Sequence, residues 1–496
     1  MSALRPPRLH RRRAAALALT ALVITGCGLQ PDARQTLDAA VGGEVVGDEA
    51  SSLAGGDAAA TGDAAAPDVP GAVEAAPGDV TTFLGGGGGP GAGPRSASGG
   101  GGAPGTAPGG APGRAPGSSG ASGPAQPTSK GSTVGITDSE IRIGIHAPLS
   151  GASPLPQESF ETGKELYWKG KTVFGRKIVT EVLDDTYKPS GAVRVCQEMA
   201  RRDFIVLGGA GTDQIQACAR DRSLQRTKTP YLSAGVTENG LAAIPTYFAL
   251  SLTYPQQAPL VIENARRQDF LLKKNASGES KWAVVISDTP NFKDAQSSME
   301  AALTAAELPY KTFLTSKSPS NADATSLANE LRAYNAPVVY FLGQPTFFIN
   351  VVANTSNSLY TPVWTGVGPS MALNAVANVA CPSSGNRYDG RFLHPYQGFD
   401  KAPPEFLKAG GIDDIQLSLW LSAEILHQQL LSTKGVLTRE AFMAGLEGST
   451  YSSNGLPFVK ITKTDHFGGL AAFSLKSDCS KRQYVTLFDG KPLYAK

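Results

Sequence analysis

The chain has 496 residues and a formal net charge of +2, but its composition indicates that a large part of it does not fold. Residues 85–126 hold 18 glycines and seven prolines and no aromatic or acidic residue, so they cannot bury a hydrophobic core. The 364 residues from Thr133 onward hold all four tryptophans and all fourteen tyrosines, which is enough chain for two domains. Their 36 basic and 33 acidic residues nearly balance, which argues against nucleic acid as a partner.

The N-terminus has the pattern of an export signal. Five arginines in residues 5–13 precede the apolar run 14–24, and small residues follow up to Cys27. Eleven apolar residues are too few to span a bilayer. Residues 23–27 read Val-Ile-Thr-Gly-Cys and resemble the bacterial lipobox, in which the cysteine is acylated and becomes the first residue of the mature chain. A signal peptide over 1–26 and lipidation of Cys27 are therefore expected, with an ordinary secretory signal as the alternative.

The segment that follows Cys27 is predicted to be a disordered tether. Residues 27–132 are rich first in Ala, Gly and Asp and then in Gly, Pro, Ala and Ser. As a flexible coil this segment would span roughly 55 Å, so the folded part is expected outside the cytoplasmic membrane, anchored to it but not crossing it.

From Thr133 onward, apolar runs of strand length alternate with amphipathic runs of helix length, which is typical of βαβ units and parallel sheets. Two such series predict two α/β lobes. The first series has strands over 141–148, 177–184, 204–207 and 231–233 and helices over 158–170, 190–202 and 212–225. The second has helices over 257–273, 295–307, 324–335 and 347–356 and strands over 282–287, 311–314, 338–342 and 362–364, and a further helix is predicted over 413–431.

Glycine and hydroxyl residues follow three of the predicted strands. They occur in residues 148–151, 208–212 and 233–237. In open α/β sheets the ligand binds beyond the carboxyl ends of the strands, so these loops are the candidate binding segments.

Four cysteines remain after Cys27, and an even number in an exported protein suggests disulfides. Three pairings are possible. Cys196 and Cys218 fall on consecutive predicted helices, whereas Cys381 and Cys479 lie in the last quarter of the chain, so these two pairs are favoured. Zinc is the poorer interpretation, because the sequence has no CxxC or CxxH spacing.

The loops, in this order and after a lipoprotein signal, resemble the branched-chain amino acid (Leu/Ile/Val)-binding family of type I periplasmic binding proteins, the substrate-binding proteins of ABC transporters. The segments that carry the resemblance are 143–151, 175–177, 181–185, Pro189, 208–212, 230–237, 287–288 and 340–343. The resemblance implies two Rossmann-like lobes joined by a three-strand hinge, a small-molecule solute in the cleft, an ABC permease as partner, a monomer and no cofactor. It places residues 133–253 and 386–456 in the first lobe and 254–385 and 457–496 in the second.

The resemblance also implies which residues bind the ligand. In the family, hydroxyl and amide groups after the third and fourth strands hold the ligand's carboxylate, and Thr212 and Thr237 fall at these positions beside Gly211 and Gly235. Thr212 opens a predicted helix whose free N–H groups favour an anion, although a threonine there is also a common helix cap. Ser150 holds the corresponding place in the first loop, where simple turn chemistry is the alternative.

The second lobe departs from the family pattern. Relatives that bind amino acids present an acid to the ligand's ammonium after the strand that corresponds to 362–364, but residues 365–370 contain none. Two further polar positions of the family appear as Tyr254 and Phe292, which with Gln344 are expected to line that side. Burying an ammonium without a carboxylate costs several kcal/mol, so a carboxylic acid, an amide or an aromatic solute becomes plausible beside an amino acid.

Enzyme signatures were sought and not found. The sequence has no GxSxG, HExxH or GxxxxGK[ST] motif, and Asp213 breaks the register of a dinucleotide loop at 208–212. We therefore expect a solute-binding protein of an ABC importer without catalytic or metal-binding residues. A lipoprotein that presents the solute to a membrane receptor is the alternative, and an α/β enzyme is the less favoured one.

Overall fold

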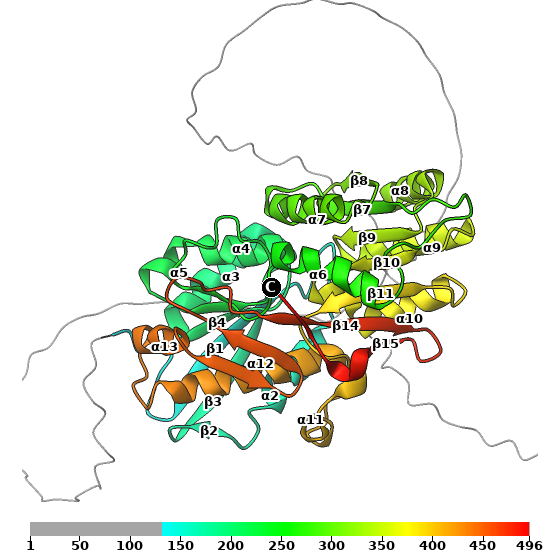
Figure 1. The fold of residues 1–496 in the computed structure, drawn as a ribbon. Helices are drawn as coiled ribbons and strands as arrows, with labels where there is room; N and C mark the ends of the chain where they lie inside the picture. The colour runs from blue at the N-terminus through cyan, green and yellow to red at the C-terminus, as the bar shows by residue number, and fades with distance from the viewer. Residues whose placement is uncertain (1–130, 496) are drawn as a thin grey trace, which may run out of the picture. The chain divides into compact units, whose positions relative to one another are not determined.

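The structure is a computed structural model, and it describes residues 131–495. These residues form two α/β lobes, each built on its own sheet (Figure 1). Ser132 already bonds to the body, donating its N–H to Glu440 and accepting from Arg439 N. The predicted signal peptide, the lipidation site Cys27 and nearly all of the predicted tether lie outside the described residues. Among the helices that are described, none combines the length and the apolar character needed to cross a membrane.

The first lobe contains a six-stranded sheet of order β2-β3-β1-β4-β5-β6, with only β2 antiparallel to its neighbour. Its strands are β1 Glu140–Ala147, β2 Thr172–Val173, β3 Arg176–Asp184, β4 Ile205–Gly208, β5 Tyr231–Ser233 and β6 Tyr247–Ala249. The connecting helices are α2 Gln157–Leu166, α3 Pro189–Arg202, α4 Thr212–Arg220 and α5 Arg222–Arg226. Later parts of the chain return beside this lobe as η3 Phe399–Lys401, α11 Pro404–Lys408, α12 Asp414–Ser432, α13 Arg439–Leu446 and the hairpin β12 Thr450–Ser453 with β13 Leu456–Lys460.

The second lobe contains an eight-stranded sheet of order β15-β14-β11-β10-β9-β7-β8, with β16 paired to β14. Its strands are β7 Trp282–Ser287, β8 Tyr310–Thr315, β9 Val338–Leu342, β10 Val363–Gly366, β11 Asp389–His394, β14 Ala471–Asp478, β15 Gln483–Thr486 and β16 Leu493–Tyr494. Its helices are α6 Tyr254–Arg267, η1 Pro290–Phe292, α7 Lys293–Ala305, α8 Asn321–Tyr334, α9 Pro345–Asn357, η2 Pro369–Ala372, α10 Asn374–Ser383 and η4 Phe488–Gly490.

Continuous apolar runs explain the central strands of this sheet. All six residues of β7 and all five of β9 are buried, as expected for parallel strands that are covered by helices on both faces. The C-terminal strands differ, because β14 pairs antiparallel with β11. The second sheet is therefore mixed, whereas the sequence predicted only parallel sheets.

The chain crosses between the lobes three times, after β6, after β11 and after β13. The second and third crossovers correct the predicted boundaries. Asp389–His394 pairs with β10 in the second sheet, so the chain returns to the first lobe after His394 and not at residue 386. Leu456–Lys460 pairs with β12 in the hairpin beside the first lobe, so the third crossover follows Lys460 and not residue 456. Both boundaries were missed because these strands are short and not uniformly apolar.

Most predicted helices have somewhat different ends in the structure, and the two predicted over 212–225 and 257–273 differ most. The helix predicted over 212–225 is broken at Asp221, whose extended backbone and carboxylate cap a new helix by accepting from Ser223 N at 2.8 Å. The helix predicted over 257–273 begins at Tyr254, because Thr253 and Gln256 form a capping box, and it ends at Arg267.

Both favoured disulfides are present. Cys196 in α3 is bonded to Cys218 in α4, and Cys381 in α10 is bonded to Cys479 at the end of β14. The first disulfide holds two helices of the first lobe together. The second connects the C-terminal strands to a helix of the second lobe.

Candidate ligand-binding site

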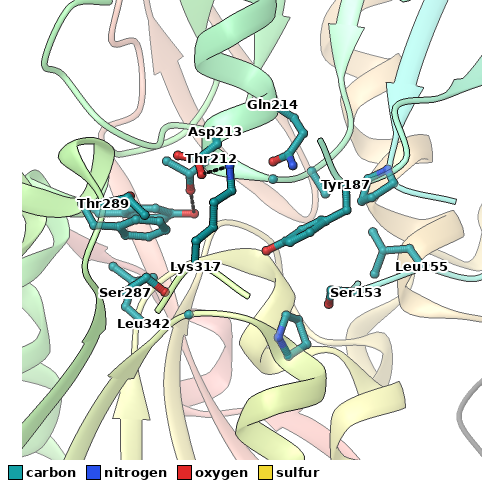
Figure 2. A pocket seen from close by; sticks show the side chains of 17 residues that line it. Ser153, Leu155, Tyr187, Thr212, Asp213, Gln214, Ser287, Thr289, Lys317 and Leu342 are labelled. Carbon is teal, nitrogen blue, oxygen red and sulfur yellow. Dashed lines mark hydrogen bonds and ion pairs between the residues drawn. The ribbon is translucent and has the colours of Figure 1, made fainter. Parts of the chain in front are cut away.

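A cavity lies between the lobes, at the carboxyl ends of the strands of both sheets (Figure 2). Its volume is about 60 Å³. That is room for roughly four to six water molecules, so in this arrangement the lobes enclose space for only a small solute. The lining consists of Pro148, Ser153, Leu155, Tyr187, Ala210, Gly211, Thr212, Asp213, Gln214, Tyr254, Ser287, Thr289, Phe292, Lys317, Leu342, Gly343 and Pro345.

The first lobe contributes the N-terminus of α4. Gly211 precedes this helix with φ +86°, a left-handed conformation, and a Cβ there would meet the Gln214 side chain at 2.3 Å. The positive φ therefore favours glycine here, whereas the Gln214 contact is less restrictive because it involves the end of a flexible side chain. Residues 211–214, at the start of this helix, line the cavity, and the free N–H groups of a helix start favour a negatively charged or hydrogen-bond-accepting group.

An ion pair between the lobes crosses the cavity. Asp213, in the first turn of α4, accepts from Lys317 Nζ at 2.5 Å, and Lys317 follows β8 in the second lobe. Asn291 Nδ2, also from the second lobe, donates to the other carboxylate oxygen of Asp213. The Asp213 side chain is only 8 % exposed and that of Lys317 is 38 % exposed. They are the only ionised side chains among the lining residues in the described part of the chain, so the one acid in the lining is already paired.

Two buried polar atoms on the lining have no hydrogen-bond partner among the described residues. They are Gln214 Nε2 in the first lobe and Thr289 Oγ1 in the second. Because an unpaired buried donor costs about 1 to 3 kcal/mol, these atoms favour a solute or water that accepts a hydrogen bond from Gln214. The hydroxyl groups of Ser153 and Ser287 are also on the lining and add capacity for a polar ligand.

Aromatic rings form one wall. Tyr254 and Phe292 stack with a centroid distance of 6.1 Å and an interplanar angle of 10°. The Thr212 hydroxyl donates to Tyr254 Oη at 3.4 Å, a long bond, so this hydroxyl is only weakly engaged. Burial raises the pKa of the Tyr254 phenol, and the Thr212 hydrogen bond opposes that shift. Tyr254 therefore remains neutral and can donate a proton in a hydrogen bond.

Tyr187 lies across the cavity from Thr289 (Figure 2). Burial raises the pKa of its phenol above the ordinary value, and the negative charge of Asp213 adds to the shift. Tyr187 is thus a neutral hydrogen-bond donor at any physiological pH. An anionic ligand would meet no ionised phenolate on either side of the cavity.

The structure places four of the eight predicted binding residues on the lining: Gly211, Thr212, Tyr254 and Phe292. The other four have protein partners and lie off the lining. Ser150 donates to Asp184 Oδ2 at 2.5 Å, Gly235 N donates to Ser251 Oγ, Thr237 donates to Asp294 Oδ2 at 2.7 Å, and Gln344 donates to Lys317 O. We therefore leave these four out of the proposed contact set. Residues 365–368 are likewise not among the lining residues.

Several lining residues were missed by the sequence reasoning. Lys317 and Thr289 each follow a strand of the second lobe at its carboxyl end, so the strand-end rule could have found both. In the sequence analysis, Asp213 served only as evidence against a dinucleotide-binding loop at 208–212. Nothing local in the sequence indicates that Asp213 and Lys317 meet.

One group of metal-type ligands is found among the described residues. An atom each of His146, Cys196 and Cys218 lies within 4.8 Å of the others. The two sulfurs are joined in a disulfide, and the His146 ring nitrogens contact Asp185 Oδ2 at 2.9 Å and Tyr231 Oη at 2.7 Å. All candidate ligand atoms of this group are therefore already bonded to other protein atoms, and none is left to coordinate a metal ion.

Two α/β lobes that are linked by three crossovers and close over a small cavity at their strand ends are the architecture that the sequence analysis predicted. The family model described as periplasmic binding protein matches residues 140–478, and the chain belongs to this family. This is a family of binding proteins, in agreement with the sequence prediction of a binding protein and not an enzyme. No curated protein matches the chain in sequence.

Solved structures share the fold at low sequence identity. A fatty acid ABC transporter substrate-binding protein from Thermomonospora curvata is 17 % identical with a TM-score of 0.61, covering 73 % of this chain and 94 % of that one. A branched-chain amino acid ABC transporter protein from Thermus thermophilus with bound valine is 14 % identical, with a TM-score of 0.58 and coverage of 72 % and 97 %. A solute-binding protein from Rhodopseudomonas palustris BisB5 with 3,4-dihydroxybenzoic acid is 16 % identical, with a TM-score of 0.57 and coverage of 72 % and 98 %. Identity this low establishes the fold alone.

Proposed function

We propose that this protein is the extracytoplasmic solute-binding component of an ABC importer and that its solute is a small carboxylic acid without an ammonium group. The observation that carries the proposal is the charge arrangement of the cavity. Lys317 supplies a cation with further N–H groups, whereas Asp213, the only acid among the described lining residues, is already engaged by Lys317 and Asn291. An acid group therefore finds donors in the cavity, but an ammonium finds no free carboxylate among the residues that the structure describes.

Other features of the lining support the same class of ligand. The unpartnered Gln214 Nε2 and the start of α4 both offer N–H groups to an anion. Apolar side chains such as Leu155, Leu342 and Phe292 suit a short hydrocarbon or aromatic body. Of the three proteins of similar fold described above, one is a fatty acid transporter protein, one contains 3,4-dihydroxybenzoic acid and one contains valine; all three compounds are carboxylic acids, and only valine also carries an ammonium.

A thermal-shift panel tests this proposal. The panel holds short carboxylic acids, aromatic acids, the matching amides and amino acids, each with the mature chain. A ligand at 100 times its Kd adds about 2.7 kcal/mol to the native state, which is readily seen as a rise in Tm. We expect acids to raise Tm and their amides not to do so. Stabilisation by amides or amino acids alone would contradict the proposed ligand class.

A separate observation distinguishes import from sensing. Genes for a permease and an ATPase beside the gene for this protein would support import.

We further propose that the protein is anchored through Cys27. Changing Cys27→Ser removes the thiol that would be acylated, so the variant is expected to leave the membrane fraction or to remain unprocessed. Metabolic labelling with a fatty acid and cell fractionation measure this, with Thr25→Ser as a control that keeps the cysteine. Lipid-labelled mature protein from the Cys27→Ser variant would contradict the anchor.

A further inference from the structure

A strained turn carries Tyr187 to the cavity. Thr186 and Tyr187, which follow β3, have φ values of +56° and +54°, a left-handed conformation that glycine and asparagine adopt most readily. Lys188 N donates to Asp185 O at 3.1 Å, so residues 185–188 close a β-turn. A β-branched and an aromatic residue are unusual at the two central positions of such a turn. Contacts with the surrounding structure must therefore hold this conformation.

Two consecutive aspartates hold the backbone of the turn. Asp185 Oδ1 accepts from Tyr187 N at 3.0 Å, and Asp184 Oδ1 accepts from Thr186 N at 2.8 Å. Each carboxylate thus binds the N–H group of the residue two positions further on. A Cβ at Gly191 would lie 2.1 Å from Asp185 O, so the first turn of α3 packs closely against the start of this β-turn.

The Asp185 carboxylate is itself oriented by a buried histidine. His146 Nδ1 contacts Asp185 Oδ2 at 2.9 Å, and His146 Nε2 contacts Tyr231 Oη at 2.7 Å. All three side chains are fully buried. Burial raises the pKa of the Tyr231 phenol, so its hydroxyl stays protonated and donates to Nε2, and Nδ1–H then donates to Asp185. The histidine therefore occupies Oδ2 of Asp185 and leaves Oδ1 for Tyr187 N.

The turn presents a hydrogen-bond donor to the cavity. The half-buried Tyr187 lies on the lining (Figure 2). Burial raises the pKa of its phenol, and a hydrogen bond with the Gln344 side chain opposes that shift only in part, so the phenol stays protonated. The contacts that fix the Tyr187 backbone all lie within the first lobe, on β1, β3, β5 and α3. They are therefore independent of how the two lobes are arranged.

We infer that Asp185 is a positioning residue of the solute site, which holds the Tyr187 phenol in the cavity as a hydrogen-bond donor for the solute. Asp185 is not among the lining residues, so it acts through Tyr187 and not on the solute itself. The inference rests on the proposed function in one respect, namely that the solute binds in this cavity. It does not depend on the state of closure of the lobes.

Fluorine NMR of the mature chain tests the positioning role without any solute. The label is 3-fluorotyrosine, placed at position 187 alone. In Asp185→Ala, which removes the acceptor of the Tyr187 N–H, the resonance is expected to move towards that of free 3-fluorotyrosine. Asp185→Asn should keep the wild-type resonance, because its amide oxygen still accepts from that N–H. Asp185→Leu keeps the volume of the side chain without the acceptor and serves where the alanine variant does not fold, with the same shift expected.

Asp221→Ala is the matched control for these spectra. Asp221 lies in the same lobe and also binds an N–H group two residues further on, that of Ser223, but it is not among the lining residues. The control is expected to leave the resonance at position 187 unchanged. A wild-type resonance in Asp185→Ala and Asp185→Leu, or the same shift in Asp221→Ala, would overturn the inference.

A double-mutant cycle with benzoate tests the consequence for binding. Tyr187→Phe removes the phenol hydroxyl and is expected to weaken benzoate binding roughly 10-fold. Asp185→Ala should weaken it by a similar factor, but in the Tyr187→Phe background it should add little, because its effect passes through that hydroxyl. Equal weakening by Asp185→Ala in both backgrounds would show a general structural role and overturn the inference. Failure of the wild type to bind benzoate would count against the proposed ligand class, whereas the fluorine spectra decide the positioning role by themselves.

Discussion

Removal of the Cys381–Cys479 disulfide is expected to lower the free energy of unfolding by roughly 4 to 5 kcal/mol, the largest effect that we expect of any single bond in the protein. The reason is loop length. This bond joins residues 98 apart in sequence, whereas Cys196 and Cys218 are only 22 apart. In the chain-entropy model a longer closed loop restricts the unfolded chain more, and the shorter loop predicts roughly 3 kcal/mol.

Denaturant unfolding of the Cys381→Ala/Cys479→Ala variant measures this loss. The matched control is Cys196→Ala/Cys218→Ala, which removes the same number of sulfur atoms from a shorter loop. Cys381, Cys196 and Cys218 are all buried, so each double variant also loses some packing. These losses partly cancel when the two variants are compared. A larger loss in the control variant than in the Cys381 variant would contradict the account based on loop length.

Changing Lys317→Gln is expected to weaken the binding of a carboxylic acid by roughly 10-fold to 150-fold. The change removes a charge-assisted hydrogen bond, worth about 1.5 to 3 kcal/mol. It also leaves the Asp213 carboxylate on the lining without its counter-ion, and that charge repels an acid ligand. Lys293→Gln, an exposed lysine of the same lobe paired with Asp288, is the control and should bind as the wild type does.

The other partner of the ion pair is expected to behave differently when it is changed, without any loss of affinity for the acid. Asp213→Asn removes the negative charge from the cavity and releases Lys317 for the ligand, so acid binding should be at least as tight as in the wild type. Calorimetric titration with the acid that gives the largest thermal shift measures both variants. Equal weakening by Lys317→Gln and Asp213→Asn would show that the pair acts only as a structural bridge.

Much of the fold follows from local sequence pattern. The strands Tyr231–Ser233, Trp282–Ser287 and Val338–Leu342 have the bounds that the sequence predicts, because each is an apolar run that ends at a turn signal. The strands β11 to β16 were not predicted. Their residues are mixed in polarity, and antiparallel pairs such as β14 with β11 join segments far apart in the chain. Local periodicity contains no information on such pairing.

The candidate site was predictable to the extent that it depends on strand ends. Gly211 and Thr212 were found because they follow β4 at its carboxyl end, and both line the cavity. The contacts that cross between the lobes could not be found in this way. Asp213 with Lys317 and Thr237 with Asp294 depend on how the lobes close, and each pair combines residues from different sheets.

The central claim is that the cavity binds an acid group and has no place for an ammonium. The most direct test is a pair of calorimetric titrations of the mature chain, one with the amino acid that gives the largest thermal shift and one with its des-amino analogue. We predict that the des-amino acid binds at least as tightly, because Lys317 and Gln214 serve its carboxylate and the Asp213 carboxylate is already paired. Tight binding of the amino acid together with no binding of its des-amino analogue would show that a carboxylate is free to receive an ammonium, and would contradict this account of the site.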